Sequence, residues 1–506
     1  ANGAYTFSTP VNFNGSYAVT VNAQPTGQTC TVANATGSNV AANVVNANIT
    51  CSTNTYTISG TVSGLVSTQQ VTLNNNSANP TTVNADGTFT FSTPVAYNTS
   101  YAVTVGTQPT GETCRMTGGS GSNVTANVSS VVVTCRLALA YVVNSTDGNI
   151  AQFTIGLDGA LTEIGTRITT GGTNPNVVTV DPAGRFAYVT NHGSGNIAQF
   201  AIDPATGLLS SLGLVSSGGP TPYSVAIDAN SQYAYVTNQD DPSGASSSVA
   251  QFTIGADGTL TAIGSGLVTL LNGGATNVVP YQITVDGQHV YVANRNTDTG
   301  NGSISQFDIG GTGALTWVAD VSTGAGSGSL GIAIKSIPGG SKFAYVDNFD
   351  VNTVSQFSIN ATTGALTAIP GNTQATGIHP YPITISADGQ FAYWANKADS
   401  EIAQCSISQV DGSLRTGCGV NTTGTGNGVT GPGAELHPQY VAIDPFGSYV
   451  YVVNFASFSG GDGQGSTVTQ YSIDKTAGPT YGNLTPLVSS ITVPTGLGPF
   501  SITTTR

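Results

Sequence analysis

Charged side chains are scarce in this chain. Asp, Glu, Lys and Arg make up only 7% of its 506 residues, against roughly 25% in an ordinary soluble domain. The 25 acids outnumber the 11 bases, and the formal net charge is −14. Binding to nucleic acid or to an anionic membrane needs a basic surface, so we expect neither as a partner.

Long apolar runs are missing as well. No stretch reaches the roughly 18 uninterrupted apolar residues of a membrane helix, so we expect no membrane span in this chain. Val, Ile, Tyr and Phe still recur at strand spacing, which excludes a disordered chain. The sequence begins with Ala and shows no signal peptide, as a mature or partial product would. Together with the abundant Gly, Asn, Thr and Ser, these features indicate a secreted β-protein.

Six cysteines fall into three local pairs. The pairs are Cys30 with Cys51, Cys114 with Cys135, and Cys405 with Cys418. Such pairing predicts disulfides and an oxidising compartment. The third pair has a geometric argument: a two-residue hairpin turn at Asp411-Gly412 would place its two cysteines directly opposite each other. That position is a non-hydrogen-bonded pair, where the two strands approach most closely.

A repeat with a period of 84 residues fills residues 1–136. Ala4–Val11 matches Thr88–Val95, and Ser16–Val21 returns as Ser100–Val105. Alternating apolar residues and regular turn signals predict a small antiparallel β-sandwich for residues 52–136. Residues 1–51 form only a partial module, because their first residue aligns with residue 85. We expect either further chain before them or strands supplied by another chain.

Seven copies of one short phrase follow in residues 137–506. They are Tyr141-Val-Val-Asn144, Tyr188-Val-Thr-Asn191, Tyr235-Val-Thr-Asn238, Tyr291-Val-Ala-Asn294, Tyr345-Val-Asp-Asn348, Tyr393-Trp-Ala-Asn396 and Tyr451-Val-Val-Asn454. Their spacings are 47, 47, 56, 54, 48 and 58 residues. A period near 50 with alternating strands inside each unit predicts a seven-bladed β-propeller. We expect the tyrosines to pack between blades.

The first phrase has no inner strand before it, since the sandwich module occupies that place. The chain ends with Gly498–Thr505, which matches inner-strand phrases such as Val279–Val285. The C-terminal segment should therefore supply the missing strand and close the ring. The predicted fold is all-β: tandem small β-sandwich modules followed by a seven-bladed propeller closed by the C-terminal strand.

The Tyr-Val-x-Asn phrases with their Asp-Gly turns resemble the seven-bladed YVTN propeller family. That family includes 6-phosphogluconolactonase-like lactonases and repeat domains of microbial surface proteins. The N-terminal repeat resembles the immunoglobulin-like or transthyretin-like modules of bacterial surface proteins. These resemblances imply the fold, but they leave enzymatic and structural roles open.

The longest loops follow the Tyr-x-x-Asn phrases or precede inner strands, and both kinds lie on one face, which marks that face as a contact surface. Its polar candidates are His192, Asp240, Asp241, Arg295, Asp350, His379, Lys397 and His437. A lactone hydrolase could use a histidine as general base and an arginine to stabilise an oxyanion. The structural alternative is that His379 and His437, which each precede a proline, serve turn geometry. No metal-ligand spacing occurs, so we expect neither a metal nor a cofactor.

The leading functional hypothesis from the sequence is a non-enzymatic surface protein outside the cell. It would be a subunit of an extracellular filament, stalk or surface layer, with itself as partner through the N-terminal modules. Low charge, short linkers and the lack of a convergent catalytic set favour this hypothesis. An extracellular lactonase-like hydrolase is the first alternative. A carbohydrate- or peptide-binding adhesin is the second, and exposed aromatics such as Phe455 or Phe458 would favour it.

Overall fold

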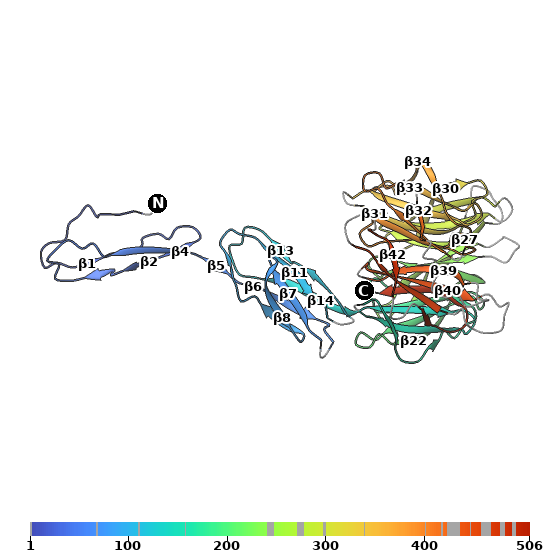
Figure 1. Ribbon diagram of the computed structural model, residues 1–506, viewed down its shortest axis with the longest axis horizontal. Coiled ribbons are helices and arrows are strands. Elements are labelled where there is room, and N and C mark those ends of the chain that lie inside the picture. The colour runs from blue at the N-terminus through green and yellow to red at the C-terminus, as the bar shows by residue number, and fades with distance from the viewer. Residues whose placement is uncertain are drawn as a thin grey trace. The chain divides into compact units, whose positions relative to one another are not determined.

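The computed structural model shows a chain of two compact units, residues 1–136 and 137–506. It describes residues 3–66, 69–109, 112–156, 158–239, 247–270, 278–296, 300–337, 340–399, 401–415, 418–421, 436–445, 447–456, 467–475, 481–487 and 492–505. Their regular structure consists of strands, and Figure 1 shows these strands with their connecting loops. Among these residues we find no helix with the length and apolarity needed to cross a membrane.

The second repeat of the first unit is built from two four-stranded sheets. One sheet has the order β13 (Ser120–Gly121), β11 (Tyr101–Thr107), β7 (Val71–Asn75), β8 (Ala78–Val83). The other has the order β12 (Glu112–Thr117), β14 (Val128–Leu137), β6 (Ile58–Ser63), β9 (Gly87–Thr90). A short ladder joins β5 (Thr55–Tyr56) to β10 (Val95–Ala96). Alternate residues such as Ile58, Val71 and Val131 are fully buried in a shared core, as the period of two demands.

The first repeat contains two short ladders. One pairs β1 (Tyr17–Ala18) with β3 (Thr36–Gly37), and the other pairs β2 (Gln28–Ala33) with β4 (Asn48–Thr53). Its apolar side chains are open to solvent: Tyr5, Phe7 and Val11 are 43%, 61% and 43% exposed. Their counterparts Phe89, Phe91 and Val95 in the second repeat are 4%, 1% and 7% exposed. The difference arises because residues 1–51 contain no counterparts of β6 and β7, which help to form the core of the second repeat.

Three disulfides join the predicted cysteine pairs, Cys30–Cys51, Cys114–Cys135 and Cys405–Cys418. The turn assumed for the third pair is different. The Ser408 amide donates to the Ser413 carbonyl and the Gly412 amide to the Ser408 carbonyl, so the turn is longer than two residues. The register then shifts, and Gln404 pairs with Gly419, which places the two cysteines directly opposite each other. The pairing is confirmed, although a longer turn and a register shift produce it.

Seven sheets form the blades of the second unit, and the strands of each are named from the inner strand outward. Blade 1 contains β44 (Pro499–Thr505), β15 (Leu139–Asn144), β16 (Asn149–Ile155) and β17 (Leu161–Glu163), with β18 (Ile168–Thr169) also on β16. Blade 2 contains β19 (Pro175–Val180), β20 (Phe186–Asn191), β21 (Asn196–Ile202) and β22 (Leu209–Ser216). Blade 3 contains β23 (Thr221–Ile227), β24 (Tyr233–Gln239), β25 (Ser248–Ile254) and β26 (Leu260–Thr269).

The remaining four blades repeat this antiparallel order. Blade 4 contains β27 (Val278–Asp286), β28 (His289–Asn296), β29 (Gly302–Ile309) and β30 (Leu315–Gly324). Blade 5 contains β31 (Ser329–Ser336), β32 (Lys342–Asn348), β33 (Thr353–Ile359) and β34 (Leu366–Ala375). Blade 6 contains β35 (Thr384–Ile385), β36 (Phe391–Asn396), β37 (Glu401–Ser406) and β38 (Gly419–Asn421). Blade 7 contains β39 (Leu436–Ile443), β40 (Tyr449–Ala456), β41 (Thr467–Ile473) and β42 (Leu484–Pro486), with β43 (Thr492–Pro494) also on β41.

The repeated tyrosine joins each blade to the next one. All seven tyrosines are fully buried, and each hydroxyl donates to a glycine carbonyl in the outer turn of the following blade. The bonds run from Tyr141 to Gly207 (2.6 Å), Tyr188 to Gly258 (2.7 Å), Tyr235 to Gly313 (2.8 Å), Tyr291 to Gly364 (2.7 Å), Tyr345 to Gly412 (2.6 Å), Tyr393 to Gly482 (2.8 Å) and Tyr451 to Gly159 (2.9 Å). A buried hydroxyl needs such a partner, so one residue supplies both packing and blade registration.

The C-terminal strand closes the ring, as the sequence predicts. Strand β44 pairs antiparallel with β15 as the inner strand of blade 1, with Ile502 opposite Val142. The Ser501 hydroxyl donates to the Asn176 carbonyl at 2.7 Å and accepts from the Val178 amide at 3.2 Å. These contacts tie the end of the chain to both blade 1 and blade 2.

Candidate functional site

The strand directions bring most of the predicted site residues to one face of the propeller. In each blade the second strand ends at the Asn of the repeated phrase or one or two residues after it. This end lies opposite the start of the inner strand, as Asn294 lies opposite Pro280. We call this side of the wheel the Asn face. Loops that follow the second strands, and residues that begin the inner strands, therefore share it.

Arg295 and Asp350 form an ion pair between blades 4 and 5. Arg295 Nε lies 3.0 Å from Asp350 Oδ2, and Nη2 donates to Oδ1 at 3.1 Å. Two parallel contacts fix the orientation of the guanidinium as well as its position. The Tyr281 hydroxyl is hydrogen-bonded to the same guanidinium; burial raises the pKa of Tyr281, and Arg295 opposes that rise. The guanidinium is one-third exposed, so it is both held in place and reachable from solvent.

Aromatic rings continue this cluster into blade 6. The His379 ring stacks on Phe349 with centroids 4.3 Å apart and an interplanar angle of 10°. Phe349 also meets Tyr381 edge-on at 5.8 Å. The backbone of His379 has a φ of +57°, and its amide donates to Asn352 Oδ1 at 2.9 Å. The turn geometry expected for His379 is therefore present, and the ring stacks on an aromatic neighbour as well.

Lys397 and His437 complete the series in blades 6 and 7. Lys397 Nζ lies 5.2 Å from the centre of the Tyr381 ring, and burial lowers the pKa of the ammonium group. His437 Nδ1 lies 3.2 Å from the Lys397 carbonyl oxygen. A carbonyl can only accept, so Nδ1 carries the proton and Nε2 has the lone pair in the neutral ring. This is the tautomer that a general base on Nε2 requires.

These contacts join five of the eight polar candidates into one continuous series, which we call the polar arc. The polar arc consists of Arg295, Phe349, Asp350, His379, Tyr381, Lys397 and His437. His192 lies apart in blade 2, where it is hydrogen-bonded to Gln239 and burial lowers its pKa. Asp240, Asp241 and Phe458 lie outside the described residues. Phe455 is half-buried on β40, opposite His437.

A ring of aromatic side chains fills the axis beside the polar arc. Tyr223 meets Tyr281 at 5.0 Å and Phe500 at 6.1 Å between centroids. It is hydrogen-bonded to Tyr381, and Tyr440 is hydrogen-bonded to Gln282. Burial raises the pKa of both Tyr381 and Tyr440 to about 12. The ring therefore supplies neutral hydroxyl groups at neutral pH.

One acid is buried next to this ring, at a position where the other repeats have Val, Thr or Ala. Asp347 is the third residue of its Tyr-Val-x-Asn phrase and is fully buried. Gly331 leaves room for it, because a Cβ there would collide with Asp347 Oδ1. Burial raises the pKa of Asp347 to about 7, although the Gly331 amide favours the carboxylate. Among the described residues neither oxygen has a hydrogen bond of ordinary geometry, so the protonated acid is the favoured form.

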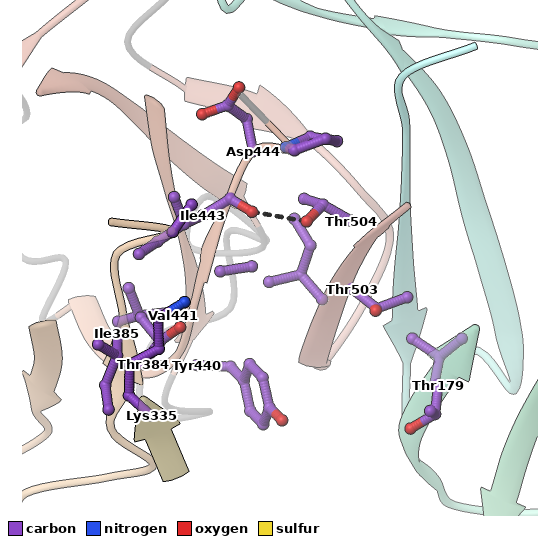
Figure 2. Close-up of a pocket in the computed structure, with 15 residues that line it drawn as sticks. Thr179, Lys335, Thr384, Ile385, Tyr440, Val441, Ile443, Asp444, Thr503 and Thr504 are labelled. Carbon is purple, nitrogen blue, oxygen red and sulfur yellow. Dashed lines mark hydrogen bonds between the residues drawn. The ribbon is translucent and has the colours of Figure 1, made fainter. Parts of the chain in front are cut away.

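A cavity of about 350 Å³ lies at the opposite end of the axis (Figure 2). Thr179, Lys335, Thr384 and Thr503 line it from the far ends of inner strands, and Tyr440 lies between them in the view of Figure 2. The only carboxylate in its lining, Asp444, accepts hydrogen bonds from backbone amides at 2.5 and 2.6 Å. No histidine lines this cavity. Its residues offer no evident base for chemistry, so the polar arc is the better candidate.

Within the described ranges no group of three or more His, Cys, Asp or Glu side chains could hold a metal ion. The sequence pointed to five members of the polar arc: Arg295, Asp350, His379, Lys397 and His437. It did not single out Asp347 or the tyrosines at the axis. A signal existed for both: a Pro-Tyr pair lies near the start of three inner strands, and one phrase carries an acid at an otherwise uncharged position.

The fold and the site define a seven-bladed propeller with a polar face. The family model described as lactonase, 7-bladed beta-propeller, matches residues 104–202, 131–269, 193–329 and 245–379. These matches together span residues 104–379, which is more than half of the chain. The chain belongs to this family.

Solved structures show the same fold. The chain is 21% identical to a candidate 6-phosphogluconolactonase from Bacteroides fragilis, with 73% of this chain and 98% of that chain covered and a TM-score of 0.56. It is 18% identical to a periplasmic gluconolactonase from Pseudomonas aeruginosa, with 73% and 99% covered and a TM-score of 0.55. A protein from Lactobacillus plantarum is 20% identical, with the same coverage and a TM-score of 0.57. A comparison with curated proteins found no match.

The prediction of a filament, stalk or surface-layer subunit is wrong. The matching family model is a lactonase family, which favours the first alternative instead. Low charge, disulfides and short linkers describe the composition of the chain and the compartment that suits it. They carry no information on chemistry, because the side chains of the polar arc come from different blades and meet only in the folded wheel.

Proposed function

We propose that this protein is a lactonase-like hydrolase whose active site is the polar arc. The observation that carries the proposal is the continuous series from Arg295 to His437, which combines a possible base with two cations on one face. Lactone hydrolysis needs a base to activate water and positive charge to stabilise the oxyanion. The names of the related solved structures support the same reaction class.

In this proposal His437 is the general base. Water attacks the lactone carbonyl carbon, and Nε2 takes the proton that water releases. The Lys397 ammonium stabilises the negative charge on the former carbonyl oxygen, while Arg295, held by Asp350, orients the ring substituents. When the ring C–O bond breaks, His437 returns the proton to the departing oxygen. The product is an open-chain hydroxy acid.

Replacing His437 should show whether its role is catalytic or structural. We expect His437→Gln to lower kcat/KM for lactone hydrolysis at least about 100-fold, the usual contribution of a general base. The matched control is His289→Gln, because His289 pairs with Asp308 at 2.8 Å on the face opposite the Asn face. Initial rates of acid release, followed at constant pH, measure both variants.

The control should retain the wild-type rate, and both variants should unfold at the wild-type temperature. Equal losses in the two variants would remove His437 from the mechanism. No acceleration of any lactone by the wild-type protein would reject the hydrolase itself.

The finer organisation of the chain also belongs to this proposal. We infer that residues 1–51 and 52–136 are immunoglobulin-like or transthyretin-like modules, and that residues 137–506 form a YVTN-type propeller. The period of 84 residues and the seven Tyr-x-x-Asn phrases support this division. Self-association through the N-terminal modules stays a prediction. Three disulfides support action outside the cytoplasm, at the cell surface or beyond it.

A further inference from the structure

The polar arc carries little positive charge that is not already compensated. Its two cations are Arg295 and Lys397, and Asp350 neutralises Arg295 through two contacts of 3.0 and 3.1 Å. Lys397 packs over Tyr381, and burial lowers the pKa of its ammonium group. One partly desolvated ammonium is thus the main positive charge that the arc can offer to a substrate.

Two acids follow this lysine closely in the chain, Asp399 and Glu401. Asp399 Oδ2 accepts the amide hydrogen of Ile378 at 2.5 Å, next to His379 in the chain. Glu401 begins β37 opposite Asn396, and burial and then the charge of Asp399 raise its pKa. With Arg295, Lys397 and Asp350, these two acids bring the formal charge of the site to −1.

The stretches outside the described residues contain no further cation for this face. Apart from Arg506 they have no Lys, Arg or His, and Arg506 follows the far end of the inner strand β44. Their other charged residues are all acids: Asp240, Asp241, Asp298, Glu435 and Asp462. The sequence alone therefore excludes a hidden basic cluster there.

A phosphate monoester carries close to two negative charges at neutral pH. Proteins hold such groups with clusters of Arg and Lys or with helix N-termini. The described residues contain no helix, and the site has one cation that is not paired with an acid. A dianion would also be repelled by the surrounding acids. An uncharged sugar ring, in contrast, can pack its C–H groups on Phe349, His379 and Tyr381.

We propose that the substrate of the polar arc is an uncharged, unphosphorylated aldonolactone, and that the site discriminates against its phosphate ester. This inference rests on the proposed function and names its substrate class. The stacked rings and the hydroxyl groups at the axis bind the sugar lactone. The acids that follow Lys397 set the charge selection.

The test compares two lactones that differ only in charge. The intact protein is assayed at low ionic strength with glucono-1,5-lactone and with its 6-phosphate, above the uncatalysed rate of each. We expect kcat/KM to be at least about 10-fold higher for the unphosphorylated lactone. Added salt should narrow this ratio, because it screens repulsion between exposed charges.

Variants that remove one negative charge test which acid causes the preference for the unphosphorylated lactone. Glu401→Gln should raise kcat/KM for the phosphorylated lactone several-fold and so narrow the ratio between the two substrates. The control Asp308→Asn removes the same charge from a side chain that is 52% exposed on the opposite face, and it should change neither value. Preference for the phosphorylated lactone, or equal use of both, would overturn the inference and leave the hydrolase standing. Acceleration of neither lactone would overturn the proposed function, and the inference with it.

Discussion

Deleting residues 494–506 is expected to abolish the cooperative thermal unfolding of the propeller. The deletion removes β44, the inner strand of blade 1, and exposes the edge of β15, whose residues are all buried in the intact chain. It also removes Ile502 from the core and the Ser501 hydroxyl that bonds to blade 2. An open propeller keeps an unpaired edge and a broken hydrophobic core, so the loss should spread beyond one blade.

Calorimetry and tryptophan fluorescence measure this loss, since Trp317 and Trp394 both lie in the propeller. Two single substitutions in the same segment serve as graded controls. Ile502→Ala truncates a buried side chain and should lower the free energy of unfolding by about 2–5 kcal/mol. Leu497→Ala changes a side chain that is 43% exposed and should have an effect within about 0.5 kcal/mol. A truncated chain with the wild-type transition would show that β44 does not close the wheel.

Asp347→Asn is expected to make the protein more stable at pH 7 and to leave its stability near pH 4 unchanged. Burial raises the pKa of Asp347 from 3.8 to about 7 in the folded protein. Between these two values the unfolded chain releases a proton that the folded protein keeps, so the free energy of unfolding falls as pH rises. Below pH 4 both states are protonated, and above about pH 7 both are ionised. The difference of about 3 in pKa corresponds to about 4 kcal/mol of lost stability.

Urea unfolding at several pH values between 4 and 8 measures this effect. The difference between wild type and variant isolates Asp347, because Asn has nearly the same shape and does not titrate. Asp203→Asn is a control with the opposite sign. Hydrogen bonds from the Thr206 and Ala205 amides lower the pKa of Asp203, so its contribution is present at neutral pH and lost as the solution becomes acidic. A wild type and an Asp347→Asn variant with parallel pH profiles would contradict the prediction.

The sequence by itself determined the propeller and its closure. The Tyr-x-x-Asn phrase appears once in each blade because every blade makes the same contact with the next blade. Its tyrosine must pack against the next blade and find a carbonyl there, as Tyr235 does with Gly313. The closing strand at the C-terminus could be predicted as well, because the inner strands share a pattern of residues that Gly498–Thr505 repeats. The cysteine pairs were readable as well, because each pair is local in the chain.

Only the tertiary structure decided which polar residues meet. Arg295 and Asp350 are 55 residues apart and belong to different blades, and nothing in the local pattern around either one points to the other. His192 has the same position in its blade as several members of the polar arc, yet it lies apart with Gln239. The angle between blades around the axis sets these contacts. That angle depends on the packing of whole sheets, which no short stretch of sequence reports.

Burial of single polar groups was also a tertiary outcome. Asp347 occupies the position in its phrase that Thr190 and Thr237 occupy in theirs, and the neighbouring residues are similar. Burial raises its pKa, and the side chain can be buried there because Gly331 leaves room for it. Local sequence determines which residues alternate along a strand, because that period is built into the backbone. The surroundings of each side chain come from residues far away in the chain, so the chemistry of this site became visible only in the closed wheel.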